Sequence, residues 1–199
     1  VLAAQTTRLL KDPKARGLAL EFGTRWLHIR ELRRNREKNE KLFPTFNDEL
    51  REALFEESVR FFQHLFREGR PMDELLTADY VFANGALAKH YGIPGLTGPE
   101  WHKVEGARKF GRGGVLGLGG VLAQESGASR PRPVLRGNWV VDTLLGEKLP
   151  KPPANVPQLP QEEGGQELTV RELTASHTRL PECATCHVRI DPFGFALEP

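Results

Sequence analysis

Apolar residues recur at helical spacing near the start of the chain. They stand three or four residues apart, which predicts one apolar stripe along a long helix: Leu18, Phe22, Trp26, Ile29 and Leu32. Asp12 and Pro13 come just before this run, as a capping residue and a first-turn proline do. The charged run from Arg30 to Lys41 predicts a solvated end of this helix, with an electrostatic docking patch as the alternative.

Two more helices are predicted before residue 95. The first spans 47–67 and ends before Gly69 and Pro71, with a buried face made of Leu50, Leu54, Ser58, Phe61, Phe62, Leu65 and Phe66. The second spans Tyr80 to His90 and ends at the Tyr-Gly-Ile-Pro run of 91–94. Aromatic residues at these spacings are typical of a protein core.

Glycines crowd together between residues 111 and 120, interleaved with Val and Leu. A phosphate-binding loop would need G-x-x-x-x-G-K-[ST], or G-x-G-x-x-G between a strand and a helix, and the segment has neither. We therefore interpret it as a tight turn that packs closely against its neighbours.

The last third combines short helices with a proline-rich connector. We predict a helix over 136–145, an extended polyproline strap over 149–160 and a polar loop to Gln166. Thr169 and Glu172 form a capping box for a helix that ends near Thr178. Pro181 then opens a further helix, which Pro192 is expected to end before a turn at Gly194.

The predicted fold class is therefore mostly α. We expect a helical domain at 1–94, a Gly-rich loop with short helices at 95–148, a Pro-rich linker at 149–166 and a small unit at 167–199. A length of 199 residues with 39% hydrophobic residues supports a sizeable core.

Charge and hydropathy exclude some classes of partner. The 28 basic residues face 26 acidic ones, a net charge of +2 that does not indicate nucleic acid. No apolar run approaches the roughly 20 residues of a membrane span. Because the chain begins at Val1 and stops without an obvious terminal element, we expect a processed protein or a piece of a longer one.

Both cysteines of the chain lie in one short motif, Cys183-Ala-Thr-Cys186-His187. C-x-x-C-H is the attachment sequence of c-type haem. Two thiols on one helical turn can form thioethers with the two vinyl groups of the porphyrin, and the histidine that follows can bind iron as the proximal ligand. Because haem c is attached outside the cytoplasm, the motif predicts a periplasmic, cell-surface or extracellular protein.

Two other chemistries use paired cysteines. A zinc site needs four ligands, for which Cys183, Cys186, His187 and His177 are the candidates, although adjacent ligands strain a tetrahedral site. A thioredoxin-like centre needs a strand before the motif, where the sequence predicts a helix. Both alternatives stay open on the motif alone.

The residues around the motif resemble those of planctomycete-type cytochrome proteins. In that family a histidine-bearing helix leads into C-x-x-C-H, and an Asp-Pro-hydrophobic-Gly-Phe-Ala-Leu-Glu signature follows, as at 172–187 and 191–198 here. The resemblance extends upstream through 75–82, 90–94, 112–116, 136–140 and the proline strap. It implies two consecutive domains of unknown function and one covalent haem c in a cytochrome c-like unit at the C-terminus.

The second axial ligand of the iron decides what such a haem does. His177, on the helix before the motif, is the first candidate, and Met72, the single methionine, is the weaker alternative. We expect Arg179 and Arg189 to pair with propionates. Phe193 and Phe195 are expected to cover a porphyrin edge, which would raise the reduction potential.

The sequence thus predicts a mono-haem cytochrome that carries single electrons between redox partner proteins. A haem enzyme of the peroxidase or oxidase type is the alternative, because a haem with one open face binds small molecules. A third possibility is an electron-transfer subunit of a larger complex or filament, in which His177 would bind the iron of a neighbour.

Overall fold

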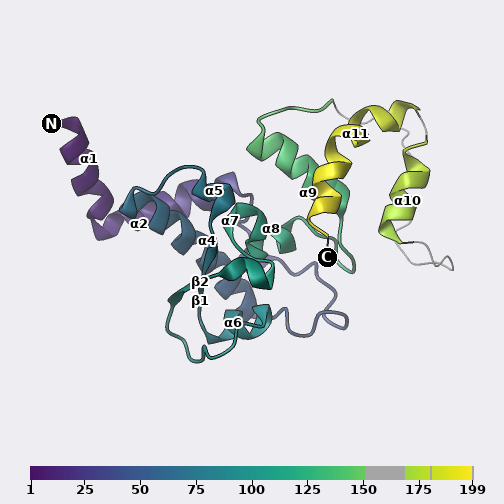
Figure 1. The fold of residues 1–199 in the computed structure, drawn as a ribbon. Coiled ribbons are helices and arrows are strands. Elements are labelled where there is room, and N and C mark those ends of the chain that lie inside the picture. Colours follow the sequence, from purple (N-terminus) through teal and green to yellow (C-terminus); the bar gives the residue numbers. More distant parts are fainter. Residues whose placement is uncertain (151–168, 180, 199) are drawn as a thin grey trace. The chain divides into compact units, whose positions relative to one another are not determined.

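The computed structural model describes residues 1–150, 169–179 and 181–198 (Figure 1). The chain divides into two compact units, Val1–Gln124 and Glu125–Pro199. Helices predominate, as predicted, and the described residues contain two short strands. Residues 95–148, expected as one segment, are divided between the two units. Most of the predicted Pro-rich linker at 149–166, which includes the polyproline strap, lies outside the described residues.

The first unit is built around one long helix. Its elements are α1 (Leu2–Lys11), η1 (Pro13–Ala15), α2 (Arg16–Leu18), η2 (Ala19–Gly23), α3 (Thr24–Trp26), η3 (Leu32–Arg34), α4 (Asp48–Glu68), α5 (Glu74–Thr77), β1 (Tyr80–Ala83), α6 (Gly85–Tyr91), β2 (His102–Glu105), η4 (Ala107–Phe110), α7 (Gly114–Gly117) and α8 (Gly119–Gln124). Helix α4 matches its prediction. The side chain of Asn47 accepts a hydrogen bond from the Leu50 N–H at 2.9 Å, and Gly69 ends the helix with a φ of 58°.

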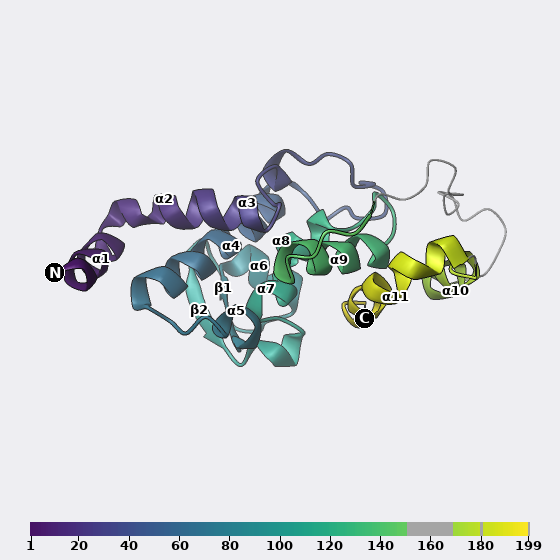
Figure 2. The ribbon, with the colours of Figure 1, turned by 90° about the horizontal axis from the view of Figure 1, so that it is seen from above.

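The helix predicted after Pro13 is shorter than expected and buries a different face. Figure 2 shows α2 and α3 running as one rod beside α4. Leu18 and Phe22 are each 47% exposed, although the Phe22 ring still contacts rings of α4. The residues of this rod that are buried are small ones, Ala19, Gly23 and Thr24. A side chain at Gly23 would lie 2.7 Å from the Phe62 ring. The π-helical turn η2 adds a residue per turn and so rotates the apolar stripe.

The rest of the predicted stripe lies beyond the helix. His28 has a φ of 61°, so the chain turns there. Ile29 and Leu32 are fully buried in the segment that follows. The sequence pattern also missed α1, none of whose residues is buried.

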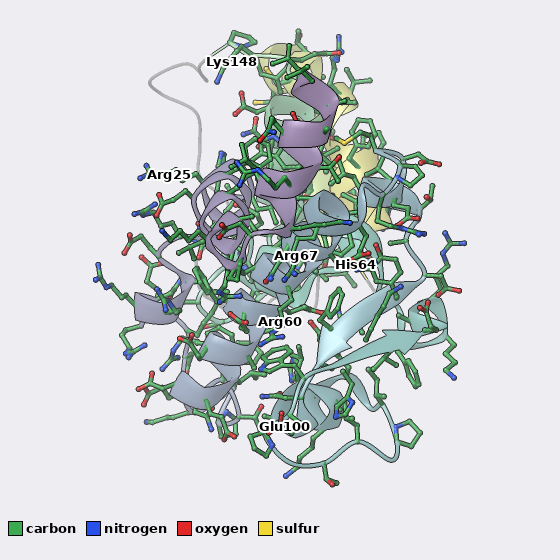
Figure 3. All side chains as sticks on the ribbon, turned by 90° about the vertical axis from the view of Figure 1, so that its left-hand side faces the viewer. Arg25, Arg60, His64, Arg67, Glu100 and Lys148 are labelled. Atoms are coloured by element: carbon green, nitrogen blue, oxygen red, sulfur yellow. The ribbon has the colours of Figure 1, made fainter. Side chains whose placement is uncertain are left out.

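The helix predicted from Tyr80 to His90 is wrong in its first half. Residues 80–83 form β1, which pairs antiparallel with β2, with Tyr80 opposite Glu105. Asn84 then caps the shorter helix α6. Figure 3 labels His64 on α4 beside this sheet, where its ring centroid lies 5.3 Å from that of Tyr80. The pairing partner lies about twenty residues downstream, beyond the reach of local periodicity.

The glycine-rich segment packs tightly, as predicted, but as short helices in addition to turns. Helix α7 and the start of α8 lie within it, and η4 ends directly before it. Gly113 has a φ of 117°, and a side chain there would lie 2.3 Å from the carbonyl oxygen of Ala78. Glycine is required at such a position because only it combines this backbone with so close a contact.

A buried carboxyl group stands at the centre of the first unit. Glu57 is fully buried, and the Tyr91 hydroxyl donates a 2.6 Å hydrogen bond to its Oε2 atom. The same hydroxyl accepts a hydrogen bond from the Gly119 N–H at 3.1 Å, and the Arg112 guanidinium lies 4.3 Å from the Tyr91 ring centroid. Burial raises the pKa of Glu57 to about 8, although Tyr91 and Arg112 act in the opposite direction.

The second unit contains four described elements. They are α9 (Pro133–Trp139), η5 (Val140–Leu144), α10 (Val170–His177) and α11 (Pro181–Ala196). The predicted helices at 136–145, at 169–178 and after Pro181 are thereby confirmed. The predicted capping box is present, because the side chain of Thr169 accepts from the Glu172 N–H and the Glu172 carboxylate accepts from the Thr169 N–H.

The pKa of Glu57 predicts how stability depends on pH. A carboxyl whose pKa is about 8 when folded and about 4.5 when unfolded binds more protons in the folded state between these values. The free energy of unfolding therefore falls as pH rises from about 4.5 to 8, by at most about 1.4 kcal/mol per pH unit.

In Glu57→Gln this contribution is absent. Denaturant unfolding at several pH values measures the difference between the two proteins, with Glu52→Gln, at an exposed site, as the control. Parallel pH profiles for wild type and Glu57→Gln would contradict the assignment.

Candidate functional site

The three residues of the motif that carry chemistry lie on one turn of α11. Cys183 is 6% exposed and Cys186 is partly buried, and both are free thiols. Cys183 and His187 are four residues apart, so their side chains are neighbours along the helix, although Cys183 is buried and His187 lines a groove described below. Cys186 lies between them. The helix therefore presents two thiols and an imidazole within about one turn, as attachment to a porphyrin needs.

Helix α11 lies against α9 at backbone contact distance, and Figure 1 shows the two side by side. A side chain at Gly137 of α9 would lie 2.0 Å from the carbonyl oxygen of Ile190, and one at Gly194 of α11 would lie 2.0 Å from that of Pro133. Each helix thus supplies a glycine where the other brings its backbone closest. Any larger residue at either position would force the helices apart.

An ion pair joins the end of α11 to the same helix α9. Arg136 is 9% exposed. Its Nη1 atom donates to Glu198 Oε1 at 2.6 Å and to the Leu197 carbonyl at 3.1 Å. Its Nη2 atom donates to Ser126 Oγ at 2.6 Å. Charged hydrogen bonds in such a buried place are strong, and removing one partner leaves a buried charge. Arg136 therefore holds the chain just after the motif helix.

The imidazole of His187 has a carboxylate partner one turn further along α11. Its Nδ1 atom lies 2.9 Å from Oδ1 and 3.1 Å from Oδ2 of Asp191. The two side chains are only 13% and 19% exposed. Sequence reasoning did not single out Asp191, although the i, i+4 spacing from His187 was a signal that could have identified it.

A groove of about 660 Å³ opens beside His187. It is lined by residues of α10, of the turn after α10, and of α11: Arg171, Thr178, Ala184, His187, Val188, Asp191, Pro192, Phe195 and Ala196. Ligand sites commonly have volumes of about 300–1,000 Å³, apolar walls and a few polar groups. The groove has this composition, with His187, Asp191 and Arg171 as its ionisable groups.

The structure places the predicted arginines away from this groove and brings another one to it. Arg189 is half exposed and forms an ion pair with Glu147. Arg179 is exposed and is not among the lining residues. Arg171, which the sequence analysis did not select, lines the groove with its guanidinium 4.2 Å from the ring centroid of Phe195. Its position depends on how α10 meets α11, which no local motif reveals.

The predicted end of the motif helix at Pro192 is wrong. Helix α11 continues through this proline to Ala196. The expected turn at Gly194 is absent, because Gly194 serves the contact with α9 instead. Phe195 consequently lines the groove, whereas Phe193 is 39% exposed and is not among the lining residues. A proline in a helix costs one backbone hydrogen bond, which close packing against α9 can offset.

The two candidates for the second axial ligand, His177 and Met72, lie in different units of the chain. His177 is the last residue of α10, and its side chain lies outside the described part of the structure. The next residue, Thr178, lines the groove. Met72 belongs to the first unit, and its side chain is 70% exposed.

The chemistry of the donor set fits haem c. Two thiols and an imidazole stand at the C-x-x-C-H spacing on α11, and of these three residues only His187 lines the groove of ligand size. Across 1–150, 169–179 and 181–198, no three His, Cys, Asp or Glu side chains gather as a metal-ion cluster. The zinc alternative would rely on His177, whose side chain is not described.

Within residues 1–150, 169–179 and 181–198, no helix has the length and apolar character needed to span a membrane.

Two family models match the chain one after the other. Residues 1–93 match PSD4, described as a protein of unknown function (DUF1592). Residues 112–199 match PSCyt3, described as a protein of unknown function (DUF1588). No curated protein and no solved structure shows significant similarity. The second match contains α9, α11 and the whole candidate site.

The close contact between α9 and α11 predicts that alanine is not tolerated at its two glycines. Gly137→Ala and Gly194→Ala would each place a methyl group against backbone of the other helix, and we expect each to lower the free energy of unfolding by about 1–3 kcal/mol or more. The matched control is Gly17→Ala, which enters open space within a helix and should stabilise by about 0.5–1 kcal/mol. Chemical denaturation followed by circular dichroism compares the free energies of unfolding of the wild type and the three variants. Wild-type stability in both interface variants would contradict the packing.

Proposed function

We propose that this chain, in which a DUF1592 domain is followed by a DUF1588 domain, is an extracytoplasmic mono-haem c-type cytochrome that transfers single electrons. The observation that carries the proposal is the site on α11. Two thiols and a partly buried imidazole stand on about one helical turn, and the imidazole lines a groove of about 660 Å³. The localisation follows from where haem c is attached.

Each cysteine would form one covalent bond to the cofactor. The sulfur of Cys183 or Cys186 would add to one carbon of a vinyl group and the thiol hydrogen would go to the other carbon, so no group would be lost. His187 would bind the iron through Nε2. The bound haem would supply an iron centre that accepts and releases one electron. The close packing of α9 against α11 supports the proposal, because it fixes the helix that carries all three residues.

Other residues of the groove suit the periphery of a porphyrin. Arg171 is placed to pair with an anionic group such as a propionate, in the role expected of Arg179 and Arg189. Phe195, Val188 and Ala184 offer apolar contacts. Burial of a ring edge against them would disfavour the more positively charged oxidised state and so raise the reduction potential.

We propose His177 as the second axial ligand, with Met72 as the weaker alternative. The support is the position of α10, which ends at His177 directly before the groove residue Thr178. A site with two strong axial ligands transfers electrons to and from redox partner proteins, alone or as a subunit of a larger assembly. A second candidate function is a haem enzyme of the peroxidase or oxidase type. It would apply if no side chain of the chain filled the second axial position, because a haem with one open face binds small molecules.

Haem attachment tests the proposal directly. The full chain, produced with a cytochrome c maturation system, should carry one haem, shown by a pyridine haemochrome spectrum and an intact mass increased by one haem. Cys183→Ala/Cys186→Ala should lose covalent haem completely, because no thioether can form. Met72→Ala, which removes the other kind of sulfur side chain, is the control and should keep full haem content. A wild-type protein without the added mass would refute the proposal.

The spin state tests the second ligand. We expect the ferric wild-type protein to be low-spin by absorption and EPR, and His177→Ala to become mostly high-spin and to bind cyanide, because one strong ligand is lost. His102→Ala, at an exposed histidine of the first unit, should stay low-spin. A low-spin His177→Ala protein would exclude His177 and direct the test to Met72→Ala. A high-spin wild-type protein that reacts with peroxide would favour the haem enzyme.

A further inference from the structure

The carboxylate of Asp191 has a specific relation to the imidazole of the motif histidine. Both of its oxygens lie within hydrogen-bond distance of His187 Nδ1, at 2.9 Å and 3.1 Å. An ionised carboxylate accepts hydrogen bonds and cannot donate them, so the hydrogen of this contact belongs to Nδ1. The contact therefore selects the imidazole tautomer in which Nε2 is the nitrogen available to a metal.

Burial makes this contact more than a surface ion pair. The two side chains are 13% and 19% exposed, and both line the groove. Solvent-exposed ion pairs contribute little because water screens them, whereas a hydrogen bond to a charged group in a shielded place is strong. Metal-binding histidines commonly donate their second N–H to such a carboxylate, which orients the ring and makes it a stronger ligand.

Helix α11 holds Asp191 in place independently of His187. Ile190, directly before it, is buried against α9, where its carbonyl oxygen faces Gly137. Gly194, three residues after Asp191, makes the reciprocal contact with Pro133. The backbone at Asp191 is thus fixed from both sides, so its carboxylate can act as a preformed partner for the imidazole.

We propose that Asp191 is a positioning residue. It holds the Nδ1 hydrogen of His187, directs Nε2 to the iron, and by its negative charge strengthens the imidazole as a ligand. This inference rests on the proposed haem site and adds a residue that sets its reduction potential. A stronger, more anionic ligand stabilises the ferric state, so Asp191 lowers the potential.

The test compares two variants that each remove one negative charge from the same unit. Asp191→Asn keeps an oxygen acceptor of similar shape but removes the charge next to His187. Glu147→Gln removes the charge that pairs with Arg189 and makes no contact with His187 that the structure shows. We expect Asp191→Asn to raise the reduction potential by the equivalent of about tenfold in the ferric–ferrous equilibrium, about 59 mV for one electron. Glu147→Gln should change it several times less, and only Asp191→Asn should change the ferric EPR g-values.

The outcomes separate this inference from the function on which it rests. A wild-type protein without covalent haem overturns both. A wild-type protein with haem, whose Asp191→Asn and Glu147→Gln variants shift the potential equally and leave the g-values unchanged, overturns the positioning role alone.

If the Asp191→Asn variant does not acquire covalent haem, hydrogen exchange in the wild-type protein tests the proposal instead. In the reduced, haem-loaded protein with ¹⁵N-labelled histidine, the Nδ1 hydrogen of His187 should exchange slowly with solvent. Exchange as fast as that of a solvent-exposed imidazole would overturn the proposal.

Discussion

The contact between α9 and α11 positions the helix on which the candidate site stands. Gly137 and Gly194 lie where a side chain would meet backbone of the opposite helix at 2.0 Å, so the two helices meet through their main chains. That closeness fixes the rotation of α11 about its own axis. Cys183 and Ile190 face inward, and His187 and Asp191 face the groove. The Arg136–Glu198 ion pair holds the chain where α11 has ended.

This packing determines which charged side chains of the second unit lie at the groove. Asp191 and Arg171 lie at the groove, one against the imidazole and one against Phe195, while Arg189 is paired with Glu147 outside it. One carboxylate and one guanidinium thus line the groove beside His187. Under the proposed function, the first tunes the iron ligand and the second offers a partner to a propionate.

The first unit shows how a separate core is organised around a polar group. Glu57, Tyr91 and the Gly119 N–H form one buried chain of hydrogen bonds between α4, α6 and α8. A protonated Glu57 fits this setting because a buried charge would need a closer cationic partner. The structure assigns no ligand chemistry to this network, which serves to join the three helices.

Short-range patterns in the sequence predicted those helix ends, caps and motifs that depend only on residues nearby in the chain. The capping box at Thr169, the helix that begins near residue 47, its end before Gly69 and the motif itself were all predicted from short-range patterns. Features that depend on contacts with residues distant in the sequence were not predicted. Tyr80 to Ala83 form a strand because His102 to Glu105 pair with them. Pro192 stays within a helix because Gly194 packs on α9, and Arg171 reaches the groove only through the meeting of α10 and α11.

Under the proposed function, Cys183 and Cys186 together hold one haem covalently. Trypsin is expected to cleave after Arg179 and Arg189, which releases the peptide 180–189 with both cysteines and His187. Tandem mass spectrometry of this peptide from protein made with haem c maturation measures the claim most directly. We expect a peptide mass increased by one haem and two cysteines that resist alkylation. An unmodified peptide whose cysteines are both alkylated would contradict the proposed attachment.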